Sequence, residues 1–396
     1  MEKPVIRISV RNLVEFILRN GDLESGGTAG DKEAMLKGSR LHRKIQKQMG
    51  SHYQAEVSLK KDTEYEDLIL RVEGRADGIF TQNEKICIDE IKGVYKNLEL
   101  LAEPVLVHRA QALCYAWIYL DDHGLEEIDV QMTYVHLDTE MIKRFRETMT
   151  REELESWYQR LLDSYHKWLS YQMKWREERN RSMEKLEFPF IYRKGQKEMV
   201  AGIYHAISRK EQIFIQAPTG VGKTMSAVFP AVRSIGEGKA ETLFYLTART
   251  ITRTVAQDAF EILRKNGLLF KTVTITAKEK LCFCEKPECN PETCPYAKGH
   301  YDRINDAVYE LWTNEQSFDR ETILRQAEKW QVCPFEMSLD LSVWMDAVIC
   351  DYNYVFDPNV YLKRFFGENI SGKYLFLIDE AHNLVERGRE MYSASI

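Results

Sequence analysis

The sequence lacks the marks of a secreted or membrane protein. Its first residues contain no basic segment followed by an apolar one, and its longest apolar runs fall well short of a membrane span. An excess of positive charge is also missing, because the net charge is −6. We therefore expect a cytoplasmic protein that does not bind membranes, while the net charge decides nothing about nucleic acid, since a binding groove can be locally basic.

Proline and glycine are modest, at 10 and 21 of 396 residues, and no repeat or low-complexity tract occurs. With 44% apolar residues, a chain of this length is expected to fold into two or three domains. Within residues 1–138, short β-rich runs mix with helical ones. Residues 71–80 and 85–92 predict a strand pair and residues 107–120 a helix, so this first part is expected to be an α/β domain.

Two further stretches follow the first domain. Residues 139–187 contain no glycine or proline and have apolar residues at helical spacing, which predicts a helical connector. From residue 188 to 396, strand-like and helix-like segments alternate, as they do in a parallel sheet with crossover helices. The expected fold class is therefore α/β for both domains, with a connector between them.

The strongest motif is a glycine-containing loop at residues 217–224, which follows a β-like run at 212–216 and precedes a helical pattern. This is the strand–loop–helix context of a phosphate-binding loop, whose glycines let backbone N–H groups converge on phosphate. Lys223 would neutralise the β- and γ-phosphates of a nucleotide, and Thr224 would hold Mg²⁺. The predicted nucleotide-binding residues of the loop are Ala217, Pro218, Thr219, Gly220, Val221, Gly222, Lys223 and Thr224.

A second motif near the C-terminus complements the loop. Residues 374–378 predict a buried strand that ends in Asp379, Glu380 and, two positions on, His382. In open α/β folds, ligands bind at this edge of the sheet. Asp379 would hold Mg²⁺ through water, Glu380 would orient and deprotonate the attacking water, and His382 would pass information between nucleotide and nucleic acid.

With these motifs, residues 188–396 resemble the XPD/DinG family of superfamily 2 DNA helicases. Residues 192–196 are similar to that family's adenine-reading motif, which assigns Arg193 and Gln196 to the nucleotide. Residues 246–250 are similar to its first DNA-contacting segment, which grips phosphates without reading sequence. The resemblance implies a RecA-like P-loop domain and 5′-to-3′ movement on single strands. Such enzymes also need a second RecA-like domain, for which no motif is present, so we expect a piece of a longer enzyme.

Five of the eight cysteines lie in the span from Cys282 to Cys333, between the two nucleotide motifs. Zinc ribbons and fingers favour close Cys-x-x-Cys pairs, which are absent here, and the irregular spacing favours iron–sulfur ligation. The helicase family has a first cysteine after a basic stretch and a last one in a Cys-Pro-aromatic turn, as at Cys282 and Cys333. We therefore expect a helical insertion at about 278–345 with a [4Fe–4S] cluster. Cys284 is left over, and Cys350, in a β-like run, is assigned to the core. The predicted ligands are Cys282, Cys289, Cys294 and Cys333.

The first domain contains a second candidate site. Asp77 lies in the first strand of the predicted pair, and Glu90 and Lys92 share one face of the second because side chains alternate along a strand. Two acids and a lysine in this arrangement are typical of a PD-(D/E)xK nuclease. In such a site Asp77 and Glu90 hold Mg²⁺ or Mn²⁺, and Lys92 steadies the water that attacks phosphate.

Residues 38–119 resemble the RecB-type branch of these nucleases. His42, in a Gly-Ser-Arg-Leu-His run, matches the branch's leading histidine, which implies a further metal ligand. Gln111 and Tyr115, four residues apart on one helix face, match its trailing motif, which contacts DNA.

The sequence as a whole predicts an ATP-dependent DNA helicase joined to a metal-dependent nuclease, an exonuclease acting in DNA repair or recombination. The implied cofactors are ATP, Mg²⁺ or Mn²⁺ and an iron–sulfur cluster, and the implied partner is DNA with single-stranded regions. Two alternatives remain. The first domain could be a catalytically silent DNA-binding adaptor, or the ATPase half could be a regulatory switch whose cysteines bind zinc.

Overall fold

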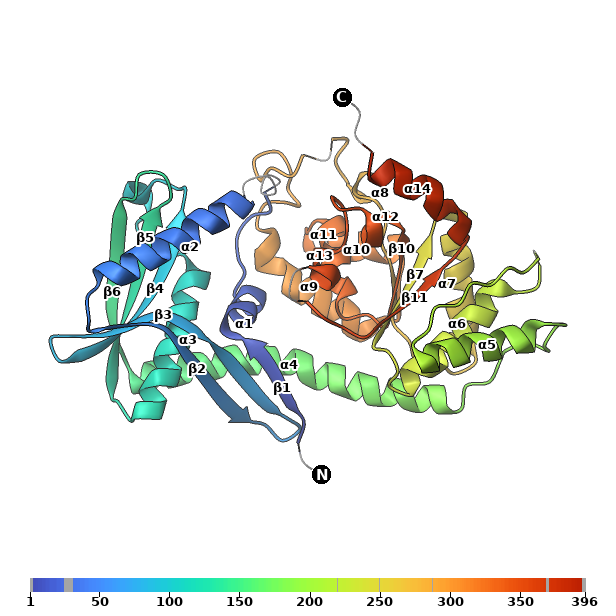
Figure 1. Ribbon diagram of the computed structural model, residues 1–396, viewed down its shortest axis with the longest axis horizontal. Coiled ribbons are helices and arrows are strands. Elements are labelled where there is room, and N and C mark those ends of the chain that lie inside the picture. The colour runs from blue at the N-terminus through green and yellow to red at the C-terminus, as the bar shows by residue number, and fades with distance from the viewer. Residues whose placement is uncertain are drawn as a thin grey trace. The chain divides into compact units, whose positions relative to one another are not determined.

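The computed structural model describes residues 3–24, 31–218, 220–248, 250–286, 288–367 and 370–393 (Figure 1). The chain divides into two compact units, residues 1–170 and 171–396, each with its own β-sheet. The predicted α/β class is confirmed for both. Among the residues described, no helix combines the length and the hydropathy that crossing a bilayer demands.

The first unit is built on a six-stranded mixed sheet of order β1-β3-β4-β5-β6, with β2 paired to β3. Strands β3 and β4 form an antiparallel hairpin, which confirms the predicted strand pair, and β4 runs parallel to β5. The turn between β3 and β4 places Asn83 and Glu84 at positive φ. The strands are β1 Val5–Ser9, β2 Tyr53–Glu64, β3 Ile69–Gln82, β4 Lys85–Val94, β5 Glu127–His136 and β6 Ile142–Thr150.

The helices of this unit pack on that sheet. Helix α3 is buried along most of its length against β4 and β5, and it confirms the predicted helix at 107–120. Gly124 ends α3 in the left-handed conformation that favours glycine, at φ +62°. Helix α2 packs against β4. The bounds are α1 Val10–Ile17, α2 Asp31–Gln48, the 3₁₀ turn η1 Leu98–Leu100, α3 Leu106–His123 and α4 Arg151–Glu184.

The predicted helical connector at 139–187 is wrong in its first part. Residues 142–150 form β6, which pairs antiparallel with β5 and alternates between half-buried and exposed side chains. Because half-buried and exposed side chains alternate along this segment, it forms a strand, although its many charged residues favour a helix. Helix α4 begins only at Arg151, where the Glu153 carboxylate accepts from the backbone N–H and the hydroxyl of Thr150.

Helix α4 continues across the boundary between the two units, which falls at Ser170. Trp168 packs on Phe16 of the first unit, with ring centroids 5.0 Å apart. Trp175 donates from its indole N–H to Asp346 of the second unit at 2.9 Å, and Asp346 also accepts from the backbone N–H of Lys271 at 2.8 Å. The helix therefore contributes buried side chains to both cores.

The second unit contains a five-stranded sheet of order β11-β7-β10-β8-β9, and every pair in it is parallel, as predicted. Leu243 and Tyr245 pack with α6 and α7, whereas Phe244, on the opposite side of the same strand, packs with Phe365 and Phe366 of α13. The strands are β7 Thr242–Thr247, β8 Thr272–Thr274, β9 Ser317–Phe318, β10 Ala347–Asp351 and β11 Tyr374–Ile378.

Helices surround this sheet. The predicted insertion at about 278–345 is largely helical, although two of its residues, β9, join the sheet. Cys350 is fully buried in β10, as expected of a core thiol. The helices are α5 Gln196–Arg209, α6 Lys223–Gly236, α7 Thr250–Lys265, α8 Lys278–Leu281, α9 His300–Asn314, α10 Arg320–Trp330, α11 Pro334–Ser342, α12 Asn353–Phe356, α13 Lys363–Phe366, the 3₁₀ turn η2 Ala381–Asn383 and α14 Leu384–Met391.

Two expectations about this sheet are wrong. Residues 212–216, predicted as the strand before the phosphate loop, have no regular structure, and Phe214 is 88% exposed. Strand β11 forms where predicted but is not buried, because Phe376 and Ile378 are more than a third exposed. The exposure of β11 has a structural cause. Within the part of the chain that the structure describes, β11 pairs with β7 alone, so its other edge lacks the neighbour that would cover it.

Candidate nucleotide and nuclease sites

The phosphate loop leads directly into helix α6. Gly220 and Gly222 have φ of +81° and +78°, and Lys223 is the first residue of the helix. The positive φ of Gly222 favours glycine, and a Cβ there would also come within 2.7 Å of the Gln196 amide nitrogen, which would have to move. Ala217, Pro218 and Val221 lie in the loop at partly or fully exposed positions, and Thr219 lies outside the described residues.

The two predicted adenine-reading residues contact this loop. Gln196 is 5% exposed, and its side chain accepts from the backbone N–H of Arg193 at 3.0 Å and donates to the carbonyl of Val221 at 3.2 Å. The Arg193 guanidinium donates to the carbonyl of Gly220. Residues 193–196 and the phosphate loop are separate along the chain but are therefore joined by hydrogen bonds.

The carboxylates after β11 face the start of α6. The Lys223 ammonium lies 3.5 Å from the Glu380 carboxylate, and the Tyr245 hydroxyl bonds the side chains of both Thr224 and Asp379. Burial raises the pKa of Asp379, and the neighbouring charge of Glu380 raises it further. A hydroxyl and two carboxylates beside a lysine are the oxygen ligands and the cation that a Mg²⁺-bound triphosphate requires. His382 is exposed, and its Nδ1 atom lies 3.4 Å from the Glu380 carboxylate.

The five cysteines of the insertion approach one another in two groups. The sulfurs of Cys284 and Cys294 are 3.8 Å apart, and burial, then the thiols of Cys294 and Cys282, raise the pKa of Cys284. The Cys289 thiol bonds the Lys278 ammonium, and burial raises the pKa of Cys333 to about 11, with Cys289 adding to the effect. The thiol chemistry fits an iron–sulfur cluster. The predicted spare, Cys284, thus contacts Cys294, a predicted ligand.

The candidate nuclease residues also converge. Asp77 and Glu90 lie across the β3–β4 hairpin, the Lys92 ammonium is 2.8 Å from the Glu90 carboxylate, and His42 Nδ1 is 3.7 Å from Asp77. Asp77 accepts the backbone N–H of Ile91 at 2.7 Å. As they stand, no three histidine, cysteine or acidic side chains of the described residues are grouped tightly enough to enclose a metal ion.

Two buried oxygens at this site have no hydrogen-bond partner among the described residues, Glu90 Oε2 and Gln111 Oε1. Each side chain is 4% exposed. Burial raises the pKa of Glu90, and Asp77 raises it further, while Lys92 opposes both. The Tyr115 ring packs directly on Gly74, where a Cβ would meet its hydroxyl at 2.6 Å. The donor types fit a hard divalent cation, and the unpartnered oxygens are acceptors that such a cation or a substrate donor would satisfy.

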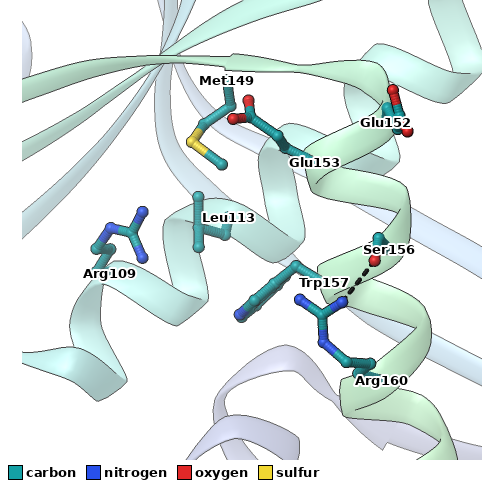
Figure 2. A pocket seen from close by; sticks show the side chains of 8 residues that line it. All are labelled: Arg109, Leu113, Met149, Glu152, Glu153, Ser156, Trp157 and Arg160. Atoms are coloured by element: carbon teal, nitrogen blue, oxygen red, sulfur yellow. Dashed lines mark hydrogen bonds between the residues drawn. The ribbon is translucent and has the colours of Figure 1, made fainter.

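A separate pocket of about 400 Å³ lies elsewhere in the first unit, between α3, β6 and the start of α4 (Figure 2). None of the predicted site residues lines it. Its polar groups are largely engaged already, because Arg109 pairs with Glu147 at 2.6 Å and Arg160 with the Ser156 hydroxyl. The pocket is lined by Arg109, Leu113, Met149, Glu152, Glu153, Ser156, Trp157 and Arg160.

Sequence comparisons decide the identity of the second unit. The family model described as DEAD/DEAH box helicase matches residues 193–288, and the DEAD_2 model matches residues 265–396. Residues 193–396 are therefore similar to superfamily 2 helicases, and residues 265–396 to the DEAD_2 helicases in particular. The predicted relation to XPD-like helicases is confirmed for this helicase region. Neither matched family model reaches the first unit.

Curated relatives agree with this assignment. The regulator of telomere elongation helicase 1 homolog of Caenorhabditis briggsae is 23% identical over 247 residues, 51% of this chain and 24% of the relative. The human regulator of telomere elongation helicase 1 is 22% identical over 257 residues, 52% and 21% of the two chains. A Fanconi anemia group J protein homolog of Gallus gallus is 31% identical over 106 residues, 26% and 8%. The chain thus spans about a quarter or less of these relatives.

Two solved structures are similar to about half of this chain. One titled XPD helicase has a TM-score of 0.32 and 18% identity, covering 49% of this chain and 33% of that one. One titled truncated XPD has a TM-score of 0.30 and 20% identity, covering 48% and 53%.

Proposed function

We propose that the helicase region binds and hydrolyses ATP and couples the hydrolysis to movement along single-stranded DNA during repair or recombination. The observation that carries this proposal is the meeting of Lys223, at the start of α6, with Glu380, at the end of β11, 3.5 Å apart. The helix N-terminus and the lysine suit the phosphates of the nucleotide. Titration of the whole chain with Mg·ATP by calorimetry tests the nucleotide part directly.

Each residue of the site then has a distinct role. Lys223 neutralises the β- and γ-phosphates, Thr224 and Asp379 hold Mg²⁺, and Glu380 takes the proton of the attacking water. Gln196 holds the loop through Val221 and is predicted to read the adenine base. DNA is expected to contact residues 246–250, of which Arg249 lies outside the described residues. Contacts with phosphates there supply grip that does not depend on sequence.

We further propose that the first unit is a metal-dependent nuclease. The buried and unpartnered oxygens of Glu90 and Gln111 support this reading, because a purely structural site would satisfy them. Asp77, Glu90 and His42 hold Mg²⁺ or Mn²⁺, Lys92 orients the attacking water and stabilises charge on the phosphate, and Gln111 contacts the DNA. If the unit proves to bind DNA without cutting it, the adaptor alternative holds instead.

We also propose that the cysteines of the insertion bind an iron–sulfur cluster. Four thiolates suffice for such a cluster, and the insertion contains five cysteines. Cys289, Cys294 and Cys333 are the constant ligands, and the fourth is Cys282 or Cys284. The proximity of the Cys284 and Cys294 sulfurs supports Cys284 as the alternative to Cys282.

Protein purified without oxygen is expected to be brown, with a broad absorbance band near ~400 nm typical of iron–sulfur thiolate ligation. Cys294→Ser should remove the colour and the bound iron, because it deletes a constant ligand. Comparing Cys282→Ser with Cys284→Ser identifies the fourth ligand, since only the ligand's loss should bleach the protein. Cys350→Ser, at a core thiol, serves as the control and should stay brown. A colourless protein that contains zinc would contradict the cluster and favour the regulatory switch.

A further inference from the structure

The last residue of β10 joins two helices of the helicase region. The Asp351 carboxylate lies 3.0 Å from the Arg387 guanidinium of α14 and 3.7 Å from that of Arg253 in α7. Helix α14 follows the carboxylate motif at 379–382, and α7 begins at the end of the predicted DNA-contacting segment 246–250. The Asp351 carboxylate thus connects α14, which follows the predicted hydrolytic residues, to α7, which follows the predicted DNA-contacting segment.

The next residue reaches the hydrolytic motif itself. Tyr352 is fully buried, and its hydroxyl donates to the backbone carbonyls of Asp379 and Glu380, the latter at 3.1 Å. Burial raises the pKa of Tyr352 to about 12, so the hydroxyl keeps its proton at neutral pH and remains a donor. A shift of this tyrosine would move the backbone that carries both carboxylates.

Several polar atoms around this junction are buried without a partner among the described residues. They are Nε of Arg253, Nε of Arg387 and Oδ1 of Asn353. Buried polar groups in proteins are normally hydrogen-bonded, so each exception calls for a specific explanation. Both arginines pair with the Asp351 carboxylate, Arg387 at 3.0 Å and Arg253 at 3.7 Å. One ion pair can therefore shorten while the other lengthens.

We propose that Asp351 and Tyr352 are positioning residues that couple the nucleotide site to the DNA-contacting segment. DNA bound at residues 246–250 acts on α7 and Arg253, Asp351 transmits the change to β10 and α14, and Tyr352 transmits it to the carbonyls of Asp379 and Glu380. The coupling runs equally in the other direction, because linkage between two binding sites is reciprocal. This inference rests on the proposed ATP- and DNA-binding function and adds the path between the two ligands.

The test measures coupling in the whole chain. Binding of a fluorescein-labelled single-stranded oligodeoxynucleotide is followed by anisotropy with and without Mg²⁺ and a non-hydrolysable ATP analogue. In the unmodified protein the analogue should change DNA affinity by roughly 5- to 100-fold, the usual range of coupling between sites. In Tyr352→Phe and in Asp351→Asn that factor should fall below about 2-fold, while each ligand alone binds within about 3-fold of the unmodified protein.

Tyr354→Phe is the matched control, since this tyrosine is also buried, lies two residues further along, and makes no bond to the carbonyls of Asp379 and Glu380. It should retain the full coupling, and melting curves establish that all variants fold. Undiminished coupling in both test variants, or an equal loss in the control, overturns the proposed path. The path is also overturned if the unmodified chain binds both ligands without coupling. If it binds neither, the proposed function itself fails.

Discussion

Replacing Lys223 by alanine is expected to weaken Mg·ATP binding by roughly 10- to 100-fold, the loss of one to two charge-assisted contacts. Lys223 is the only residue of the loop that brings a full positive charge to the phosphates, and it already lies 3.5 Å from Glu380. The backbone donors of Gly220 and Gly222 remain, so some affinity should persist. Calorimetric titration of the two full-length proteins gives the ratio directly.

Lys265→Ala is a suitable control for that measurement, because Lys265 is an exposed lysine of the same unit at the end of α7. It should bind Mg·ATP like the unmodified protein. DNA binding by the first unit should be unchanged in both variants, since neither lysine belongs to that unit. Equal ATP affinity of the Lys223 variant and the control would rule out the phosphate-loop assignment.

The second large effect concerns the first unit. Glu90→Ala is expected to lower Mg²⁺- or Mn²⁺-dependent cleavage of single-stranded DNA by at least about 100-fold, because it deletes a metal ligand. Lys92→Ala should lower the rate while leaving metal affinity nearly intact, because lysine acts on the water and the phosphate charge. End-labelled DNA, incubated with the full chain in the absence of ATP, gives these rates on a gel.

Two variants separate chemistry from folding in this experiment. Glu99→Ala is the control, because it removes an exposed acid of the same unit. The Glu99→Ala protein should cut DNA at the normal rate. Glu90→Gln should lose cleavage but keep its melting temperature at pH 8. The folded state raises the pKa of Glu90 above 4.5, its ordinary value, so ionisation destabilises the fold as pH rises above that value, and a neutral amide avoids this cost. Cleavage that persists in the Glu90 variants would point to a contaminant or to another site.

The local motifs could be predicted from the sequence, whereas the long-range contacts could not. The phosphate loop and the acids after β11 could be recognised because short segments encode their chemistry, and the alternation in β4 placed Glu90 and Lys92 on one face. Strand β6 was missed because its arginines and glutamates favour a helix, whereas pairing with β5 depends on residues far along the chain. The contact of Gln196 with Val221 is likewise a tertiary one, and no motif announces it.

The junction at Asp351 and Tyr352 illustrates the same limit. Asp351 ends the apolar strand β10 and Tyr352 follows it, a pattern that by itself predicts only the end of the strand. Their significance depends on Arg253 and Arg387, which lie on other elements of the unit. Contacts of this kind are set by packing, so they emerge only when α7, β10 and α14 are placed together.

The open edge of β11 has a practical consequence for handling the protein. Among the described residues β11 has one unpaired edge, on which a second chain can add a strand, and the exposed side chains of Phe376 in β11 and of Phe214 offer further apolar contacts. We expect samples of this chain to associate as their concentration rises, and the effect to grow in high salt, which strengthens apolar contacts. Phe214→Lys should reduce this association, and Phe214 is neither a predicted cluster ligand nor a predicted nuclease-metal ligand. Light scattering of this variant should then give the same particle mass in dilute and concentrated solution.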